Sequence, residues 1–272
     1  MPSIHLLAGH RPKVAGALAA AAALLVMIHV GWQLFAYWTG HDYVFGLIKL
    51  FHLDEERNVP ALFSTLLLLS AAALLFHIRH HENRRGSRDA AKWTVLAIGF
   101  VYIAIDEFGH IHELLIVPGR ELLGERSLGP FYYAWVIPAT AIVLVLAAYF
   151  LGFLLRLPGP IRLGFIVGGV LFVGGAIGFE MLEGRHDELY GEQSLTYRAY
   201  VTLEDSLEMA GVIVFIHALL RYIDEYLAVA PGAGSSTQRA PAPARPVPAA
   251  GTRSAATMPV SAATSRGSKA AP

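Results

Sequence analysis

Residues 105–115, IDEFGHIHELL, place ionisable side chains directly after an apolar run that is long enough to enter a membrane. They are Asp106, Glu107, His110, His112 and Glu113. Ionisable groups at membrane depth are costly unless they are paired, hydrated or bound to a cation. Carboxylates and imidazoles are also the ligands that divalent metals take when thiolates are absent. The stretch therefore indicates a functional site within a membrane segment.

Three further segments carry polar side chains that recur on one face of a predicted helix. The shared faces hold Glu180, Glu183 and Asp187; Glu204 and Glu208; and His29 and Gln33. Two ExxH pairs, Glu107 to His110 and Glu183 to His186, have the spacing that di-iron carboxylate bundles use. Gly184 could end its helix before His186, so the individual acids are a better guide to the site than the ExxH pattern.

Apolar runs dominate the chain, which is 55% hydrophobic and 15% charged. A helix needs about 20 apolar residues to cross a bilayer core about 30 Å thick. Six segments approach that length, and they lack the polar stripe of a soluble helix. They are residues 14–37, 60–77, 93–117, 133–155, 163–183 and 200–220. The predicted fold is an all-α bundle of six transmembrane helices over residues 14–225, with the first helix uncleaved.

The distribution of basic residues predicts the orientation of this bundle. One set of connections holds Arg11 and Lys13, the basic cluster of residues 79–92, and Arg156 and Arg162. With six helices these connections share one side, which places both termini, including residues 1–13, in the cytoplasm. The 21 basic and 21 acidic side chains cancel, so nothing suggests nucleic acid as a partner. Multi-pass insertion into a bacterial inner membrane is the expected location.

Helix geometry then gives the depth and direction of each acid. At about 1.5 Å per residue, Asp106 lies about 20 Å beyond Trp93, and Glu204 and Glu208 lie about 6 and 12 Å below the outer boundary. On a straight helix Asp106, His110 and Glu113 point the same way, Glu107 lies to one side, and His112 points away. These depths predict a polar chamber in the outer third of the membrane.

Two segments outside the bundle have simpler predictions. Residues 43–53, YVFGLIKLFHL, are expected to form a short amphipathic helix along the outer interface. Residues 226–272 are rich in Ala, Pro, Ser and Thr, and are expected to be a disordered cytoplasmic tail.

Three stretches resemble the marked segments of an uncharacterised bacterial family of multi-pass membrane proteins. They are FHLDEERNVPALFSTLLLL (51–69), IDEFGHIHE (105–113) and LEDSLEMAG (203–211). The family pattern has an acidic-Asn-Pro turn before one helix, Asp-Glu followed by Ile-His-Glu at the end of another, and paired glutamates at the start of the last. The resemblance implies a polytopic membrane protein and leaves open whether His110 or His112 belongs to the site.

Function is predicted from the acids themselves. The metal ligands are expected among Asp106, Glu107, His110, Glu113, Glu180, Glu204 and Glu208, with Glu107, Glu113 and Glu208 as general bases. The donor set suits a divalent Zn, Fe or Mn ion, because the chain has no cysteine. Hydrolysis or redox chemistry at the outer face would follow. Haem would not explain so many carboxylates.

Two alternatives use the same residues. The acids could serve a cation- or proton-coupled carrier, although the inner halves of the helices offer little beyond His77 and His217. They could also line a hydrated cleft in a structural subunit without catalytic activity. The sequence names no substrate and no protein partner, and the lipid bilayer is the only partner that it implies.

Overall fold

The computed structural model describes residues 2–41, 43–55, 57–124 and 127–227. All of them belong to the first of two units, Met1–Ala230. The second unit, Pro231–Pro272, lies outside the described residues. The predicted tail therefore lies outside them too, apart from its first two residues.

The described residues are helical or lie in short connections, and none of them is in a strand. In chain order the elements are α1 (Pro2–Gly9), α2 (Arg11–Thr39), α3 (Leu47–Leu50), α4 (Val59–Arg84), α5 (Ala90–Gly109), the 3-10 helix η1 (His112–Leu115), α6 (Ile116–Leu123), the 3-10 helix η2 (Gly129–Phe131), α7 (Val136–Arg156), α8 (Gly159–Val173), the π-helix η3 (Gly174–Phe179), α9 (Glu180–Tyr190), α10 (Leu195–Tyr222) and the π-helix η4 (Ile223–Leu227). The predicted all-α class is confirmed.

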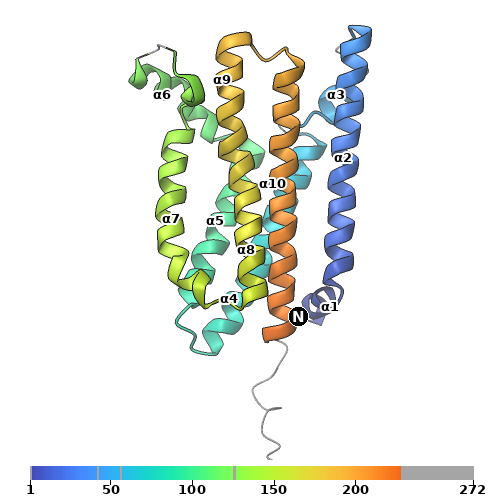
Figure 1. Cartoon of the computed structure of the whole chain (residues 1–272). Helices are drawn as coiled ribbons and strands as arrows, with labels where there is room; N and C mark the ends of the chain where they lie inside the picture. The colour runs from blue at the N-terminus through green and yellow to red at the C-terminus, as the bar shows by residue number, and fades with distance from the viewer. Residues whose placement is uncertain (1, 42, 56, 125–126, 228–272) are drawn as a thin grey trace, which may run out of the picture. The chain divides into compact units, whose positions relative to one another are not determined.

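Membrane-spanning helices make up most of this unit (Figure 1). Five are long and apolar enough to cross a bilayer, and a bent pair, Ala90–Gly109 with His112–Leu123, makes a sixth when it is counted as one span. Arg11 at the start of α2 forms ion pairs of 2.6 and 2.9 Å with Asp224 and Glu225 after α10. The first and last spans thus begin and end on the same side, as six crossings require. The chain is an integral, multi-pass membrane protein.

Local side-chain chemistry sets the ends of the helices next to the site. The side chain of Asn58 accepts a hydrogen bond of 3.0 Å from the Ala61 backbone N–H, and Pro60 follows it in the first turn of α4. Ser194 caps α10 in the same way through the Tyr197 N–H. Such caps satisfy backbone donors that the first turn leaves free.

The segment before α4 differs from the predicted interfacial helix of residues 43–53. Only Leu47–Leu50 is helical, and Ile48 and Leu53 are buried. The Asn58 side-chain amide donates to the carbonyls of Lys49 and His52 and so holds this segment against the bundle. These bonds between residues in different parts of the loop favour a folded loop over a free amphipathic helix.

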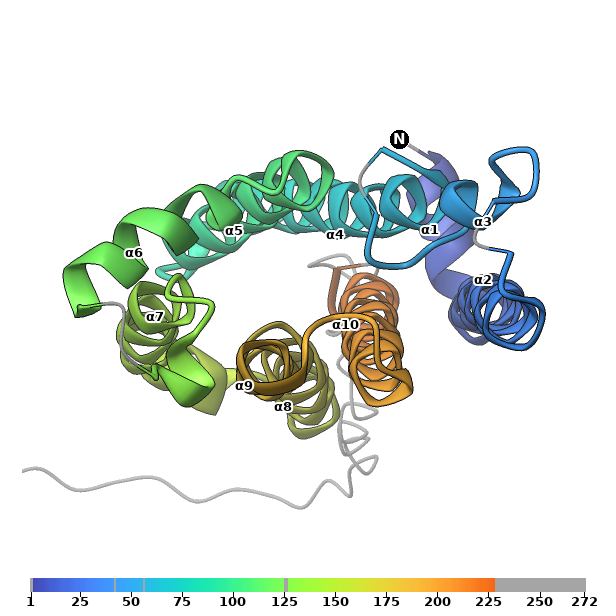
Figure 2. The same ribbon diagram turned by 90° about the horizontal axis from the view of Figure 1, so that it is seen from above.

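The helices form two rows when they are viewed from above (Figure 2). One row contains α4, α5 and α6, and the other contains α7, α8 with α9, and α10, with α2 beside α10. Part of the hydrophobic core joins the rows in the half of the bundle that holds Arg11 and Asp224. There Trp93 is 1% exposed, and its ring lies 5.0 Å from the rings of both Phe153 and Tyr222.

Close packing of α8 and η3 against α10 brings two acidic segments together. A Cβ at Gly168 would lie 2.8 Å from the Gly211 carbonyl oxygen, and one at Gly175 would lie 2.8 Å from that of Glu204. Small residues let membrane helices approach this closely. The π-helix η3 contains Gly175 and leads directly into Glu180, the first residue of α9.

Candidate metal centre

A chamber of about 580 Å³ lies between the two rows at the end of the bundle remote from Arg11 and Asp224. Its acidic lining residues are Asp54, Glu107, Glu113, Glu180, Glu183, Asp187, Glu192, Glu204, Asp205 and Glu208. The cationic side chains that line it are Arg120 and, when protonated, His110 and His112. The guanidinium of Arg120 stacks 3.5 Å from the Tyr132 ring, and its Nε donates to the Tyr132 carbonyl. The acids therefore far exceed the cations that could balance them.

Three glutamates form the tightest cluster in the chamber. Glu180, Glu183 and Glu204 each place a carboxylate oxygen within 4.8 Å of the other two. Glu180 and Glu183 are three residues apart in the first turn of α9, so both project toward the same side. Glu204 comes from α10, which Gly175 brings close. The cluster therefore depends on packing between two helices.

Glu183 is the most buried member of the cluster, with 3% of its surface exposed. Its Oε1 atom has no hydrogen-bond partner among the described residues. A buried carboxylate oxygen without a donor is expensive, and native structures rarely retain one without a reason. A cation held between the three carboxylates would supply the missing partner.

His112 supports this cluster from the opposite row. Its Nδ1 lies 2.7 Å from Oδ2 of Asp106, and its backbone N–H donates to Oδ1 of the same carboxylate. Its ring lies 4.3 Å from the ring of Trp135, whose Nε1–H donates to Oε1 of Glu180 at 2.9 Å. A carboxylate that orients an imidazole is the usual arrangement behind a metal-binding histidine. Asp106 therefore lies behind the chamber wall and holds His112.

This arrangement corrects the prediction that His112 points away from the site. The prediction assumed a straight helix over residues 93–117, but α5 ends at Gly109 and the following segment bends by 78°. His110 adopts the left-handed conformation, with φ 44° and ψ 45°. The bend turns both histidines toward the chamber, where His110 contacts Glu113 at 2.6 Å.

The floor of the chamber is formed by Glu107 from α5 and by Asp205 and Glu208 from α10. Below Glu107 and Glu208 lies a void of only about 10 Å³. It is lined by Ser64 and by the apolar side chains of Leu67, Leu68, Phe172, Met209 and Val212. The chamber is therefore closed on this side by tightly packed apolar residues.

Six of the seven predicted ligands line the chamber: Glu107, His110, Glu113, Glu180, Glu204 and Glu208. The seventh, Asp106, does not line it but contacts His112, which does. Two other predicted candidates do not join it. His29 and Gln33 line a neighbouring pocket. His186 contacts the Ser194 hydroxyl at 2.6 Å and does not line the chamber, although α9 runs through Gly184 to Tyr190, so the second ExxH pair is not brought together there.

The predicted ligand set omits five acids that line the chamber: Asp54, Glu183, Asp187, Glu192 and Asp205. Glu183 shares a predicted helix face with Glu180, which was the signal for it, and Asp205 lies one position beside the predicted Glu204 face. Asp54 lies in the LDEERN segment, one of the stretches that resemble the family, and this resemblance could have indicated it as a site residue. Displacement of water by the surrounding protein raises the pKa of Asp54 to about 7, and repulsion from Glu180, Glu192 and Glu113 adds to this shift.

Comparisons with known proteins give a family for the chain. No curated protein and no solved structure matches it. The model of the Domain of unknown function (DUF8692) matches residues 17–223, which span α2 to α10 and contain every residue of the chamber. The chain therefore belongs to the DUF8692 family.

Proposed function

We propose that the chamber binds a divalent metal ion and that Glu180, Glu183 and Glu204 are its primary ligands. The observation that carries this proposal is the approach of three carboxylates to within 4.8 Å, with Oε1 of the buried Glu183 lacking a hydrogen-bond partner in the described chain. Several acids and few cations face the chamber, so an ion there would offset the cost of keeping them ionised.

The surrounding residues narrow the choice of ion. An oxygen-only triad would accept Mg²⁺ or Ca²⁺, which prefer carboxylates. Imidazoles on the facing wall, His110 and His112, favour Mn, Fe or Zn, which take mixed oxygen and nitrogen ligands. The Asp106 carboxylate holds Nδ1 of His112, so the Nε2 atom of the same ring is the one available to bind a metal. We therefore favour Mn, Fe or Zn.

A bound metal would supply an acidified water for hydrolysis or, if it is redox-active, a centre for electron transfer. The chain's own residues would position the reactants. Glu107 and Glu208 on the floor and Glu113 beside His110 are the candidate general bases. The apolar floor would confine this chemistry to one side of the membrane. With the cytoplasmic termini that the basic residues favour, that side is the outer face.

Metal analysis of protein purified in detergent tests this proposal. Wild type should contain a stoichiometric transition metal, and the double variant Glu183→Gln with Glu204→Gln should retain at least about tenfold less. Glu121→Gln is the matched control, because this exposed glutamate in α6 does not line the chamber. Equal metal content in wild type and the double variant would refute the proposed ligands.

A carrier remains the second candidate, because two spans near the chamber are irregular: the bent pair at His110 and the π-helix η3. Discontinuous helices commonly form ion sites in transporters. Proton- or cation-coupled uptake into liposomes, lost in the same double variant, would favour the carrier. Metal-dependent turnover without uptake would favour the enzyme.

A further inference from the structure

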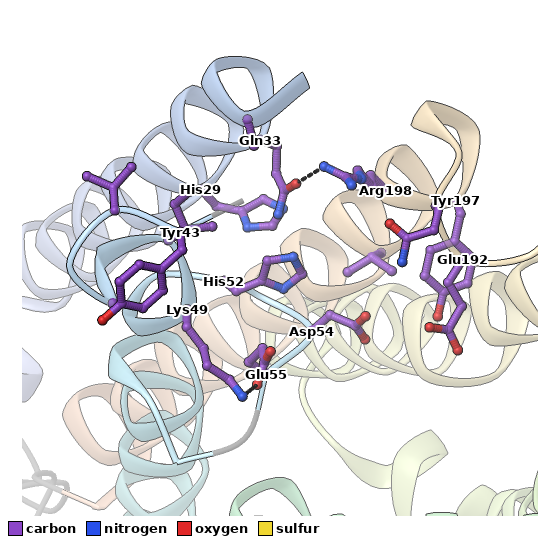
Figure 3. A pocket seen from close by; sticks show the side chains of 16 residues that line it. His29, Gln33, Tyr43, Lys49, His52, Asp54, Glu55, Glu192, Tyr197 and Arg198 are labelled. Carbon is purple, nitrogen blue, oxygen red and sulfur yellow. Dashed lines mark hydrogen bonds and ion pairs between the residues drawn. The ribbon is translucent and has the colours of Figure 1, made fainter. Parts of the chain in front are cut away.

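A second pocket, of about 470 Å³ (Figure 3), shares four lining residues with the chamber and therefore lies beside it. The shared residues are Asp54, Glu192, Tyr197 and Val201. The other side of the pocket is formed by α2, which contributes His29 and Gln33, and by Arg198 of α10. The pocket therefore has two chemically different sides.

Hydrogen-bond donors gather on the side formed by α2 and α10. Nη1 of Arg198 donates to Oε1 of Gln33 at 2.6 Å. Among the described residues, this neutral amide is the only hydrogen-bond partner of the Arg198 guanidinium. The other guanidinium donors are left for an anion, which arginine binds in a forked geometry. Arg198 thus offers a positive charge that no carboxylate of the described chain neutralises.

His29 adds a donor to the same side. Its Nδ1 accepts the Leu53 backbone N–H at 3.1 Å, so the proton of the neutral ring is on Nε2. That Nε2 has no hydrogen-bond partner among the described residues, and the side chain is 1% exposed. A metal-binding histidine would instead donate through its second nitrogen, so His29 is not placed as a ligand. Its Nε2–H lies just behind the pocket surface, and a small side-chain movement would turn it toward an oxygen anion in the pocket.

Carboxylates gather on the opposite side of the pocket. Glu55 forms an ion pair of 3.1 Å with Lys49, whereas Asp54 and Glu192 have no ion-pair partner in the described chain. Figure 3 shows both of these acids across the pocket from Gln33. An occupant with an anionic group at one end and an ammonium at the other would satisfy both sides.

An apolar groove of about 500 Å³ runs along the same two helices toward the opposite end of the bundle. It is lined by Ala19, Ala22, Ala23, Val26 and Met27 of α2 and by Ser206, Met209, Ala210, Ile213 and Val214 of α10. Met27 at its upper end is two residues from His29, a rise of about 3 Å. Met27 is 63% exposed, so the groove faces the lipid.

We propose that this pocket and groove together bind a phospholipid with an ethanolamine headgroup. The phosphate lies against Arg198 and Gln33, in front of the buried His29 ring, the ammonium lies between Asp54 and Glu192, and an acyl chain occupies the groove. From Gln33 to Ala19 the helix rises about 21 Å, enough for a phosphate and most of one acyl chain. The order of groups along α2 matches the order in the lipid, because the phosphate is nearest the acyl chains.

Native mass spectrometry of the full chain, titrated with defined lipids in detergent, tests this proposal. Phosphatidylethanolamine should bind more tightly than phosphatidylcholine, which lacks ammonium N–H donors, and more tightly than phosphatidylglycerol, which lacks the cation. Arg198→Gln should weaken phosphatidylethanolamine binding by about tenfold, the loss of one charge-assisted contact. Arg88→Gln, an exposed arginine outside both pockets, should leave it unchanged.

A groove variant keeps the test independent of the headgroup pocket. Ala23→Trp should fill the groove and displace lipid, whereas Ala20→Trp, exposed on the same helix outside the groove, should not. Equal affinity for the three lipids, no effect of Arg198→Gln, or a dimer that excludes lipid from the groove would each overturn the proposal.

The lipid site does not depend on the proposed metal, because the triad shares no residue with the pocket. Lipid binding should persist in Glu183→Gln, and metal content should persist in Arg198→Gln. If Glu183→Gln lowers metal content but Arg198→Gln leaves lipid binding unchanged, only the lipid proposal has failed. The opposite pair of results would refute only the metal proposal.

Discussion

The two ends of the bundle are built in opposite ways. At the end that holds Trp93, aromatic and aliphatic side chains pack with almost no exposed surface. At the other end, ten carboxylates face a chamber, one helix bends by 78°, and another contains a π-helix. The first end supplies stability, and the second end departs from the regular geometry that stability favours. Such local departures are typical of functional sites.

The largest expected effect tests the packed end. Trp93→Ala should lower the free energy of unfolding by about 3–5 kcal/mol, because a nearly fully buried ring would leave a cavity. Phe108→Ala is the control at the other end, where the ring is 41% exposed and lines neither pocket. Thermal unfolding in detergent would measure both. A similar loss for the two variants would contradict the division between the ends.

The glycine contact should give the next largest effect. Gly168→Ala should destabilise the protein by about 1–3 kcal/mol, because its Cβ would lie 2.8 Å from the Gly211 carbonyl oxygen. Gly169→Ala should be neutral or slightly stabilising, since a Cβ there meets nothing within 4 Å. Unfolding temperatures of these neighbouring variants compare the two directly. The metal content of Gly168→Ala should also fall, as α10 moves from η3.

At the chamber, a substitution should raise the free energy of unfolding instead of lowering it. In metal-free protein, Glu183→Gln should stabilise the fold by about 1–2 kcal/mol, because it removes repulsion between carboxylates that lie close together. With metal the same variant should be less stable than wild type, because a ligand is lost. Unfolding with and without a chelator separates these effects. A metal-free variant less stable than wild type would show that the triad is held by its own hydrogen bonds.

The smallest expected effect concerns pH. The pKa of Asp54 is raised to about 7 in the folded protein, above the value of an unfolded aspartate. Between these two values the folded state binds more protons, so this group's contribution to stability falls as pH rises from about 4 to 7. Asp54→Asn should therefore lose less stability than wild type between pH 5 and pH 7. Parallel pH profiles of the two unfolding temperatures would exclude this role.

The spans could be predicted from the sequence because the hydropathy of a helix is a local property. The predicted depth of the acids rests on the same local property, the fixed rise of residues along a helix, and stays a prediction. The direction of His112 could not be predicted, because it depends on a left-handed residue at His110 and on the carboxylate of Asp106. The position of Glu183 in the triad also depends on a contact between helices, which spacing within one helix does not reveal.

The π-helix η3 has a consequence for how this site can be altered. A π turn holds more residues than an α turn, so α9 is rotated relative to the face that α8 presents to α10. Deleting one residue from Gly174–Phe179 would restore regular α winding and leave Glu180 and Glu183 on their present face, because the π turn already offsets the rotation of one residue, about 100°. The contact at Gly168 would stay in place. One residue can thus be lost at η3 while the acidic site and the packing of the membrane helices are both kept, whereas a deletion in the regular winding of α8 would turn the acids away from Glu204.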